Sequence, residues 1–393
     1  MHLLSLSRLC RGLCQGRVAD DGTRFLSAAR HNEKTRVGCR RFGRVRGSCS
    51  MARARVHIRD VARVAGVSVG TVSNVLNGRT TVKPELVARV HAAMRDLEYV
   101  PNSHARQLSS GASKSLGLLV LSNYDSFFNV LAEAAEDAAE RAGFSVLLGG
   151  SSQRAERETR YLDLFESQRV GGIMLAPIDG VSPRMRSIQA AGTPIVLLGV
   201  PDAEPDFSVV QSDAEHGGYV AVRHLIDQGR RDILMAGGPM HQVRGRIDGA
   251  TRAVAESPGI HMDYLSTVTL TIDEGRRIGA RILATPPERR PDGIFAANDL
   301  LAIGLMHEIT RESAIRVPDD LSLVGHDDIE FAATAQVPLT TVRQPVERMA
   351  QAAVELTVAE IAAGAGFEHA RRVYSPELVV RHTSRPTSVG VHR

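Results

Sequence analysis

The spacing of hydrophobic residues between positions 58 and 97 predicts three short helices. Apolar residues first recur at 58, 61, 62 and 65, the period of an amphipathic helix. Gly66 suits the end of that helix, and Ser68 suits the N-cap of a second one. Pro84 suits the first turn of a third. The inward positions of the second and third helices are Val72, Val75, Leu76, Val87, Val90, Met94 and Leu97. Two helices joined by a three-residue turn, closed by a third, form a helix-turn-helix unit.

Beyond Gly111 the pattern changes to short apolar runs that alternate with helical stretches such as 128–142 and 155–168. This alternation predicts repeated βαβ units and a parallel sheet covered by helices on both faces. The runs fall into two sets, which predict an α/β core of two Rossmann-like lobes with a cleft between them. The first set is 116–121, 144–149, 172–176 and 194–199, and the second is 232–237, 266–270, 293–298 and 321–325.

Charge is distributed unevenly along the 393 residues, whose formal net charge is +4. Residues 1–50 contain 11 Lys/Arg against 3 Asp/Glu, residues 51–115 contain 10 against 4, and the rest contains 27 against 37. A basic front on an acidic body suggests that the front meets a polyanion.

All four cysteines lie in the first 50 residues, so the body is no disulfide scaffold, and no Cys/His spacing indicates a metal site. No apolar run reaches the roughly 18 residues of a membrane span.

Residues 1–50 are rich in Arg, Ser and Gly and lack sustained periodicity. Three interpretations compete: an extension upstream of a true start at Met51, a basic arm that helps to hold DNA, and a targeting peptide. The first is favoured because the segment that Met51 opens needs nothing before it, and Arg53 and Arg55 already supply a short basic arm. We therefore expect residues 1–50 to be either disordered or an extension that lies upstream of the true start codon.

The second predicted helix carries the outward residues of the head. It leaves Val69, Gly70, Ser73 and Asn74 facing outward, with Thr71 near the turn. In a helix-turn-helix unit this helix enters the major groove of DNA, whereas a generic helical hairpin is the alternative. Residues 66–70 also match the G-x-S-x-G motif of serine hydrolases. That motif needs a strand before the serine, and the pattern predicts a helix there.

The order of these motifs resembles the LacI/GalR family of bacterial repressors from residue 57 to about 385. The segments that carry the resemblance are IRDVARVAGVSVGTVSNVLNG (58–78), LEYVPNSHARQLSSG (97–111), residues 144–177, IFAANDLLAIG (294–304), VPDDLSLVGHDD (317–328), residues 338–356 and ELVVRHTS (377–384). The resemblance implies a DNA-binding head (51–101), a hinge helix and linker (102–115), an effector-binding core (116–385) and a tail (386–393). Within the core it implies a first lobe at about 116–212 and 341–370, and a second at about 213–340 and 371–385.

The resemblance also implies which residues contact DNA. Val69, Gly70 and Asn74 would face bases, supported by Ser68, Thr71 and Ser73 on the backbone, with Asn77 at the helix end. The family usually has Arg where Asn74 stands, and Asn suits adenine rather than guanine. In the hinge, Leu108 would insert into the minor groove as an apolar wedge, with Asn102, Ala105 and Arg106 along the groove. A plain linker with Leu108 covering the core is the alternative.

Candidate effector-binding residues follow the strands of the core, because ligands in such folds bind at the carboxyl ends of strands. By position they are Asn123, Asp125 and Phe127 after the first run and Asp299 after the run at 293–298, and Asp327 and Asp328 follow the run at 321–325. The resemblance implies effector contacts for Arg246 and Asp299. An Arg and an Asp beside a cleft suit a hydroxyl-rich ligand, such as a sugar or nucleoside. Local alternatives are a helix N-cap for Asp299 and a surface ion pair with Asp248 for Arg246. For Asp327 and Asp328, turn and interdomain contacts are favoured over a metal.

Taken together, the head and the core predict a sequence-specific transcriptional regulator, a repressor by analogy with the family. We expect a homodimer that binds a pseudo-palindromic double-stranded operator in the bacterial cytoplasm, at the nucleoid. A small-molecule effector would control it, with no cofactor, no metal, no membrane partner and no catalysis. A periplasmic-type sugar-binding protein, which shares the two-lobed core, is the main alternative. It would need a secretory signal and no head.

Overall fold

The computed structural model describes residues 56–76, 82–99, 113–200 and 205–385 of the chain. Its first part is a head of three helices, α1 (Ile58–Ala65), α2 (Val69–Leu76) and α3 (Pro84–Asp96). All three lie where the hydrophobic spacing predicts them. Their apolar stripes meet in a small core, made by Val61, Ala62, Ala65, Val72, Val75, Val90 and Ala93.

The turn between α1 and α2 is fixed by local hydrogen bonds. Gly66 adopts the left-handed conformation, with φ 63°, and its N–H donates to the carbonyls of the last turn of α1. Ser68 Oγ accepts from the N–H of Thr71 at 3.0 Å, which caps the first turn of α2. From α3, the Arg89 guanidinium donates to the Ala65 carbonyl at 2.6 Å. Both helix ends at the turn are therefore satisfied, and the angle between α1 and α2 is held.

The first lobe of the core is a six-stranded sheet in the order β11-β5-β4-β3-β1-β2. All its strand pairs are parallel. The strands are β1 (Ser115–Val120), β2 (Ser145–Gly150), β3 (Gly172–Leu175), β4 (Ile195–Leu198), β5 (Ser208–Ser212) and β11 (Arg371–Tyr374). The helices are α5 (Ser126–Arg141), α6 (Ala155–Ser167), α7 (Pro183–Ala190) and α13 (Val346–Ala363), followed by the 3-10 turn η2 (Gly364–Gly366).

The second lobe repeats this plan, with the strand order β12-β10-β9-β8-β6-β7. Its pairs are parallel except for β10 with β12. The strands are β6 (Asp232–Gly237), β7 (His261–Ser266), β8 (Gly293–Ala296), β9 (Ser322–Asp327), β10 (Thr340–Arg343) and β12 (Glu377–Val379). The helices are α8 (Ala214–Asp227), α9 (Met240–Ala255), α10 (Ile272–Ala284), α11 (Asp299–Glu312) and α12 (Glu330–Thr334), with the 3-10 turn η1 (Pro287–Arg289).

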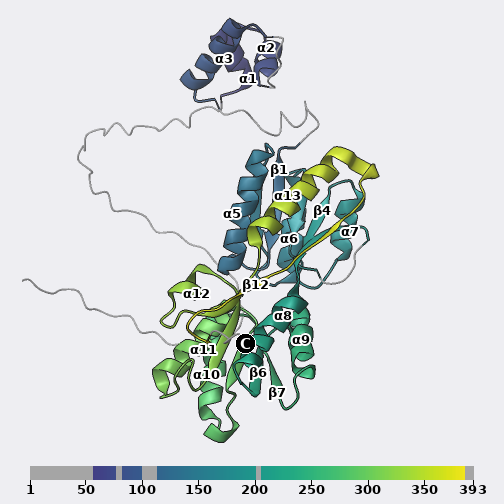
Figure 1. The fold of residues 1–393 in the computed structure, drawn as a ribbon. Coiled ribbons are helices and arrows are strands. Elements are labelled where there is room, and N and C mark those ends of the chain that lie inside the picture. Colours follow the sequence, from purple (N-terminus) through teal and green to yellow (C-terminus); the bar gives the residue numbers. More distant parts are fainter. Residues whose placement is uncertain (1–55, 77–81, 100–112, 201–204, 386–393) are drawn as a thin grey trace, which may run out of the picture.

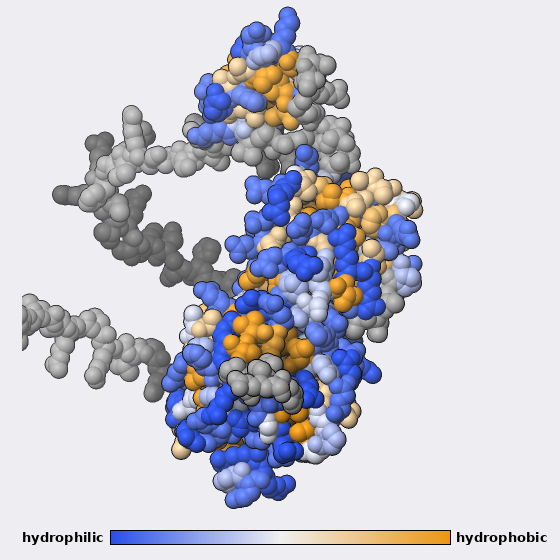
Figure 2. All heavy atoms as spheres, in the orientation of Figure 1, coloured by the Kyte–Doolittle hydropathy of each residue, from blue (hydrophilic) through white to orange (hydrophobic). Residues whose placement is uncertain are grey.

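Each sheet lies between two layers of helices, as Figure 1 shows. In the first lobe, α5 and α13 pack on one face, and α6 and α7 cover the other. In the second lobe, α10 and α11 lie on one face, and α8 and α9 on the other. The face drawn in Figure 2 is mostly hydrophilic, with apolar residues in separate patches. The apolar runs of the sequence are thus buried as strands covered on both sides.

The chain crosses between the lobes three times, after β5, after β10 and after β11. The sequence placed the second and third crossings near 341 and 371, and both positions were a few residues early. The strand β10 stays in the second sheet, and β11 returns to the first. Both strands have only four residues and no apolar run, so their sheet is decided by the partner they pair with.

One further strand lies elsewhere than predicted. The pattern indicated a strand at 266–270, whereas β7 covers His261–Ser266. This strand is at the edge of its sheet and alternates exposed with half-buried residues. An edge strand is covered on fewer sides, so it lacks the continuous apolar run by which the central strands were found.

Candidate functional site

The outward face of α2 is the first candidate site. Val72 and Val75 are buried in the head core, which turns the opposite side of the helix to solvent. Ser68, Val69 and Gly70 are exposed, and 41% of the Val69 surface is accessible to solvent. Thr71, Ser73 and Asn74 are half-buried on the same helix. These residues run from the residue before α2 along the side of the helix that is turned away from the head core, which is the geometry that a groove-binding helix needs.

Five of the predicted DNA contacts lie outside the described residues. These are Asn77 and the residues of the expected hinge, Asn102, Ala105, Arg106 and Leu108.

A cavity of about 580 Å³ between the lobes is the second candidate site. The loops at the carboxyl ends of β1, β3 and β4 line it from the first lobe. The second lobe contributes the start of α9, the segment after β7, and residues that end or follow β8, β9 and β10. Its polar lining includes Asp125, His241, Gln242, Arg246, Thr271, Asn298, Asp327 and Gln344. The cavity has the size of a small-molecule site.

Arg246 is the central cation of this cavity. Its side chain, on α9, is only 15% exposed. Nη1 donates to the Ala297 carbonyl at 2.9 Å, and Nη2 lies 4.0 Å from Asp327 Oδ1. Burial lowers the pKa of Arg246, and Asp327, Asp125 and Asp299 oppose that shift. The ion pair with Asp248 that the sequence left open is not formed, because the side chain turns inward to the strand ends.

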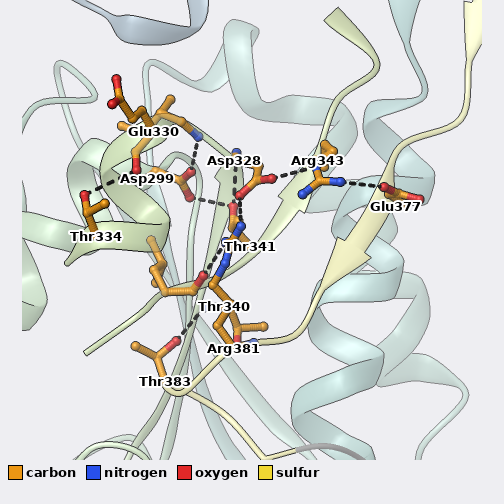
Figure 3. Close-up of polar contacts among 12 residues, drawn as sticks. Asp299, Asp328, Glu330, Thr334, Thr340, Thr341, Arg343, Glu377, Arg381 and Thr383 are labelled. Atoms are coloured by element: carbon orange, nitrogen blue, oxygen red, sulfur yellow. Dashed lines mark hydrogen bonds and ion pairs between the residues drawn. The ribbon is translucent and has the colours of Figure 1, made fainter. Parts of the chain in front are cut away.

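Asp327 ends β9 and faces Arg246 across the cavity floor. It is buried, and its φ of 109° is rare for a residue with a side chain. Oδ1 accepts from Gln344 Nε2 at 2.6 Å and lies 2.8 Å from His326 Nδ1. The neighbouring Asp328 pairs with Arg343 at 2.6 Å and Arg381 at 2.7 Å, two arginines beside the crossings between the lobes (Figure 3). Asp328 thus makes ion pairs within the second lobe, whereas the sequence favoured turn and interdomain contacts.

Asp125 and Phe127 line the cavity from the first lobe. The Asp125 carboxylate caps α5 and accepts from the Phe127 N–H at 3.1 Å. Burial, followed by the negative charge of Asp327, raises the pKa of Asp125 to about 7. Two carboxylates from different lobes therefore lie close enough to influence each other across the cavity.

Asn123 and Asp299 are not among the residues that line the cavity. Asn123 is exposed and packs its amide against Gly150. Asp299 is fully buried at the start of α11, where it accepts from Thr341 Oγ1 at 2.6 Å and from the Ile329 N–H at 3.0 Å (Figure 3). The N-cap of α11 is Asn298, one residue earlier. Asp299 therefore links α11 to the loop after β9 and to β10, without lining the cavity itself.

Sequence reasoning had named Asp327 as a residue that follows a strand but did not place it in the effector site. Its position at the end of β9, facing the cleft, was the available signal. No such signal was available for the other three residues. Gln344 follows a strand of only four residues, and His241 and Gln242 lie in the first turn of α9. The pocket brings them together only once the two sheets are in place.

Comparison with known proteins matches a family to both parts of the chain. Residues 57–102 match the model of bacterial regulatory proteins of the lacI family, and residues 222–384 match a periplasmic binding protein-like domain. The HTH-type transcriptional repressor PurR of Vibrio parahaemolyticus is 32% identical over 332 residues, covering 83% of this chain and 98% of that protein. The PurR of Photobacterium profundum is 32% identical over 330 residues.

Solved structures show the same architecture. The lac repressor dimer bound to operator and the anti-inducer ONPF superposes with a TM-score of 0.73 at 28% identity, covering 84% of this chain and 99% of that one. A complex of the transcriptional regulator CelR with cellobiose gives 0.63 at 30% identity, covering 84% and 100%.

A helix-turn-helix head followed by a two-lobed core with an interlobe cavity defines a DNA-binding transcriptional regulator with an effector domain. The chain belongs to the lacI family of bacterial regulatory proteins. Within the described residues, no helix combines the length and apolarity needed to cross a bilayer.

Proposed function

We propose that this protein represses transcription by binding a pseudo-palindromic operator as a homodimer. The observation that carries the proposal is the exposed face of α2, held at a fixed angle by the Gly66 turn, on a chain whose relatives are named repressors. One such head offers a small interface, and two heads related by a two-fold axis double it. The proposed place of action is the nucleoid in the bacterial cytoplasm, where the operator lies.

On α2, the proposed base contacts are made by Val69, Gly70 and Asn74, and Ser68, Thr71 and Ser73 face the DNA backbone. Asn74 carries amide groups that pair with adenine in the major groove. The remaining contacts come from Asn77 and from a hinge helix containing Asn102, Ala105 and Arg106, with Leu108 as the minor-groove wedge. These assignments rest on the resemblance to the family and on the exposure of α2.

The interlobe cavity is the proposed effector site. Asp125, Phe127 and Arg246 keep their proposed roles, and Asp327, Gln344 and Gln242 join them because they line the same cavity. Asp299 becomes a residue that supports the floor, and Asn123 is not part of the proposed site. A hydroxyl-rich small molecule fits this mixture of carboxylates, amides and a guanidinium, and one solved relative is a complex with cellobiose. We propose binding and no catalysis.

The proposed domain division is a head at 51–101, a hinge helix and linker at 102–115, and a core at 116–385, with 1–50 and 386–393 outside them. The three crossings divide the core into lobes at about 116–212 with 344–374 and about 213–343 with 375–385. A periplasmic-type binding protein is disfavoured as an alternative because the head precedes the core.

Selection of random duplex DNA by the purified protein, followed by anisotropy across a salt series, tests the proposal. We expect an enriched pseudo-palindrome whose half-sites are spaced for two heads. Asn74→Ala should lose preference at a single base pair in each half-site, by about 1–3 kcal/mol. Asn129→Ala, an exposed position on α5, is the control. Enrichment of no sequence, with binding that only fades as salt rises, would refute operator recognition.

A further inference from the structure

The cavity between the lobes has two chemically different walls. From the first lobe, its ionisable lining residues are Asp125 and Asp179, and its aromatic ones are Tyr124, Phe127 and Phe128. None of the described first-lobe residues that line the cavity is Lys or Arg. From the second lobe come Arg246 and His241 together with Asp327. The first-lobe wall is therefore acidic and aromatic, and among the described lining residues the one arginine, Arg246, is on the opposite wall.

Asp125 is a half-buried carboxylate that accepts a hydrogen bond from the Phe127 N–H at 3.1 Å. The charges acting on it are those of Asp327 and Arg246. Arg246 lies 4.0 Å from Asp327 and is hydrogen-bonded to Ala297, so its charge is engaged within the second lobe. A half-buried carboxylate beside another carboxylate favours a ligand that brings positive charge.

The charged groups behind this wall do not supply that charge. Glu158 is a buried acid that accepts from the Ile178 N–H, and Ile178 itself lines the cavity. Arg157 donates to Ser152 at the rim but is not among the lining residues. Phe127 and Phe128 stand edge to face, with centroids 5.1 Å apart and planes at 79°. Aromatic rings beside a carboxylate form a favourable surface for an ammonium group.

The second-lobe wall presents hydrogen-bond donors, which favour acceptor groups on a ligand. Arg246 Nε and Gln242 Nε2 are buried donors without a partner among the described residues. Donors in this state are satisfied by acceptor oxygens of a ligand. The cavity therefore suits a molecule with a cation at one end and oxygens at the other.

We propose that the effector is a small polyol carrying one protonated amine, in chemical class an amino sugar. Its amine lies against Asp125 and the two phenylalanines, and its oxygens lie against Gln242 and Arg246. An acid would meet Asp125, Asp179 and Asp327, and a neutral sugar would supply no counter-charge to the ionised form of Asp125. The inference rests on the proposed function and narrows the ligand of that same site.

Titration calorimetry of the full chain with matched sugars tests this class. The probes are glucosamine, glucose and glucuronate, and galactosamine, galactose and galacturonate. We expect at least one amine to bind about tenfold or more tightly than its hydroxyl partner, and both acids to bind most weakly. Tighter binding by the neutral or acidic member of each set, or binding by none of the six, overturns the proposal.

Two variants locate the preference. Asp125→Asn, which keeps the shape of the side chain, should bring the amine-to-hydroxyl ratio of affinities close to one. Asp137→Asn makes the same change at an exposed position of the same helix and should leave that ratio unaltered. An unchanged ratio in Asp125→Asn also overturns the proposal. Operator selection separates the two failures: enrichment of an operator without amine preference removes only the ligand class, and no enrichment removes the proposed function.

Discussion

The side-chain amide of Gln344 donates a 2.6 Å hydrogen bond to Oδ1 of Asp327, and both residues are buried. Gln344 lies in the short segment that leads from β10 in the second lobe to α13 in the first. Asp327 lines the cavity opposite Arg246. A carboxylate that can touch a ligand is therefore bonded directly to a crossing between the lobes. If the cavity is the effector site as proposed, we expect its occupancy to bias the relative position of the lobes through this bond.

Replacing Gln344 should remove its hydrogen bond to Asp327 and lower the stability of the fold. Gln344→Ala leaves Oδ1 of a buried carboxylate without its amide donor, so we expect the free energy of unfolding to fall by about 1–3 kcal/mol. Chemical denaturation followed by circular dichroism measures the change. Gln351→Ala removes an exposed amide that is bonded to Glu355 at 2.9 Å, and should change stability by less than about 0.5 kcal/mol. Equal effects of the two variants would contradict the role of the Gln344 bond.

Asp125 should make stability depend on pH between about 4 and 7. Its pKa is raised from 3.8 to about 7, so the folded state binds a proton more tightly than the unfolded state. The contribution is fully favourable below pH 4 and is lost as pH rises through 7. Asp125→Asn should therefore stabilise the protein at pH 8 by about 2 kcal/mol, allowing for solvent in the cavity, and by much less at pH 4. Urea denaturation at both pH values, with Asp137→Asn as control, checks this sign; destabilisation at pH 8 would contradict it.

Asp299 should prove to be a structural residue of the cavity floor. Burial and Asp327 raise the pKa of Asp299 well above its usual range, and its two hydrogen bonds join α11, the loop after β9, and β10. Asp299→Ala leaves Thr341 and Ile329 without their acceptor, so we expect a loss of about 2–4 kcal/mol in unfolding free energy. Asp248→Ala, at an exposed position of α9, is the control. A stability within about 0.5 kcal/mol of the parent protein would show that these bonds matter little.

Leu108 lies outside the described residues, and the resemblance to the family supports one prediction about it. If its side chain enters the minor groove at the operator centre, Leu108→Ala should weaken operator binding far more than binding to unrelated DNA. Anisotropy with the selected operator and with a scrambled duplex at the same salt concentration measures both. An equal loss on both duplexes would rule out the wedge.

Much of the fold could be predicted because its elements have strong local signals. The three helices of the head have apolar stripes, a capping serine and a terminal glycine, and all were located. The central strands β1, β3, β8 and β9 are covered on both faces and so consist of continuous apolar runs. The strand β7 was misplaced and the strands β5, β10, β11 and β12 were missed, because these short strands are defined by their pairing more than by their composition.

The candidate effector site was predicted in part. Asp125, Phe127 and Arg246 lie on the cavity, as expected from strand ends and family resemblance. Asp299 does not, although it directly follows the N-cap of a helix after a strand, as a ligand-contacting residue could. Its carboxylate is fully buried and accepts hydrogen bonds from Thr341 of β10 and from the Ile329 N–H, contacts that local sequence does not reveal.

The sequence by itself determined the helix-turn-helix head, the two α/β lobes and the membership of a DNA-binding family. Those properties follow from hydrophobic period, capping residues and motifs that act over a few positions. The tertiary structure alone decided which carboxylates face the cavity, which pair with arginines beside the crossings, and which sheet receives each short strand. These outcomes depend on contacts between residues far apart in the chain, such as Asp125 with Asp327, whose charges interact only after both lobes have formed.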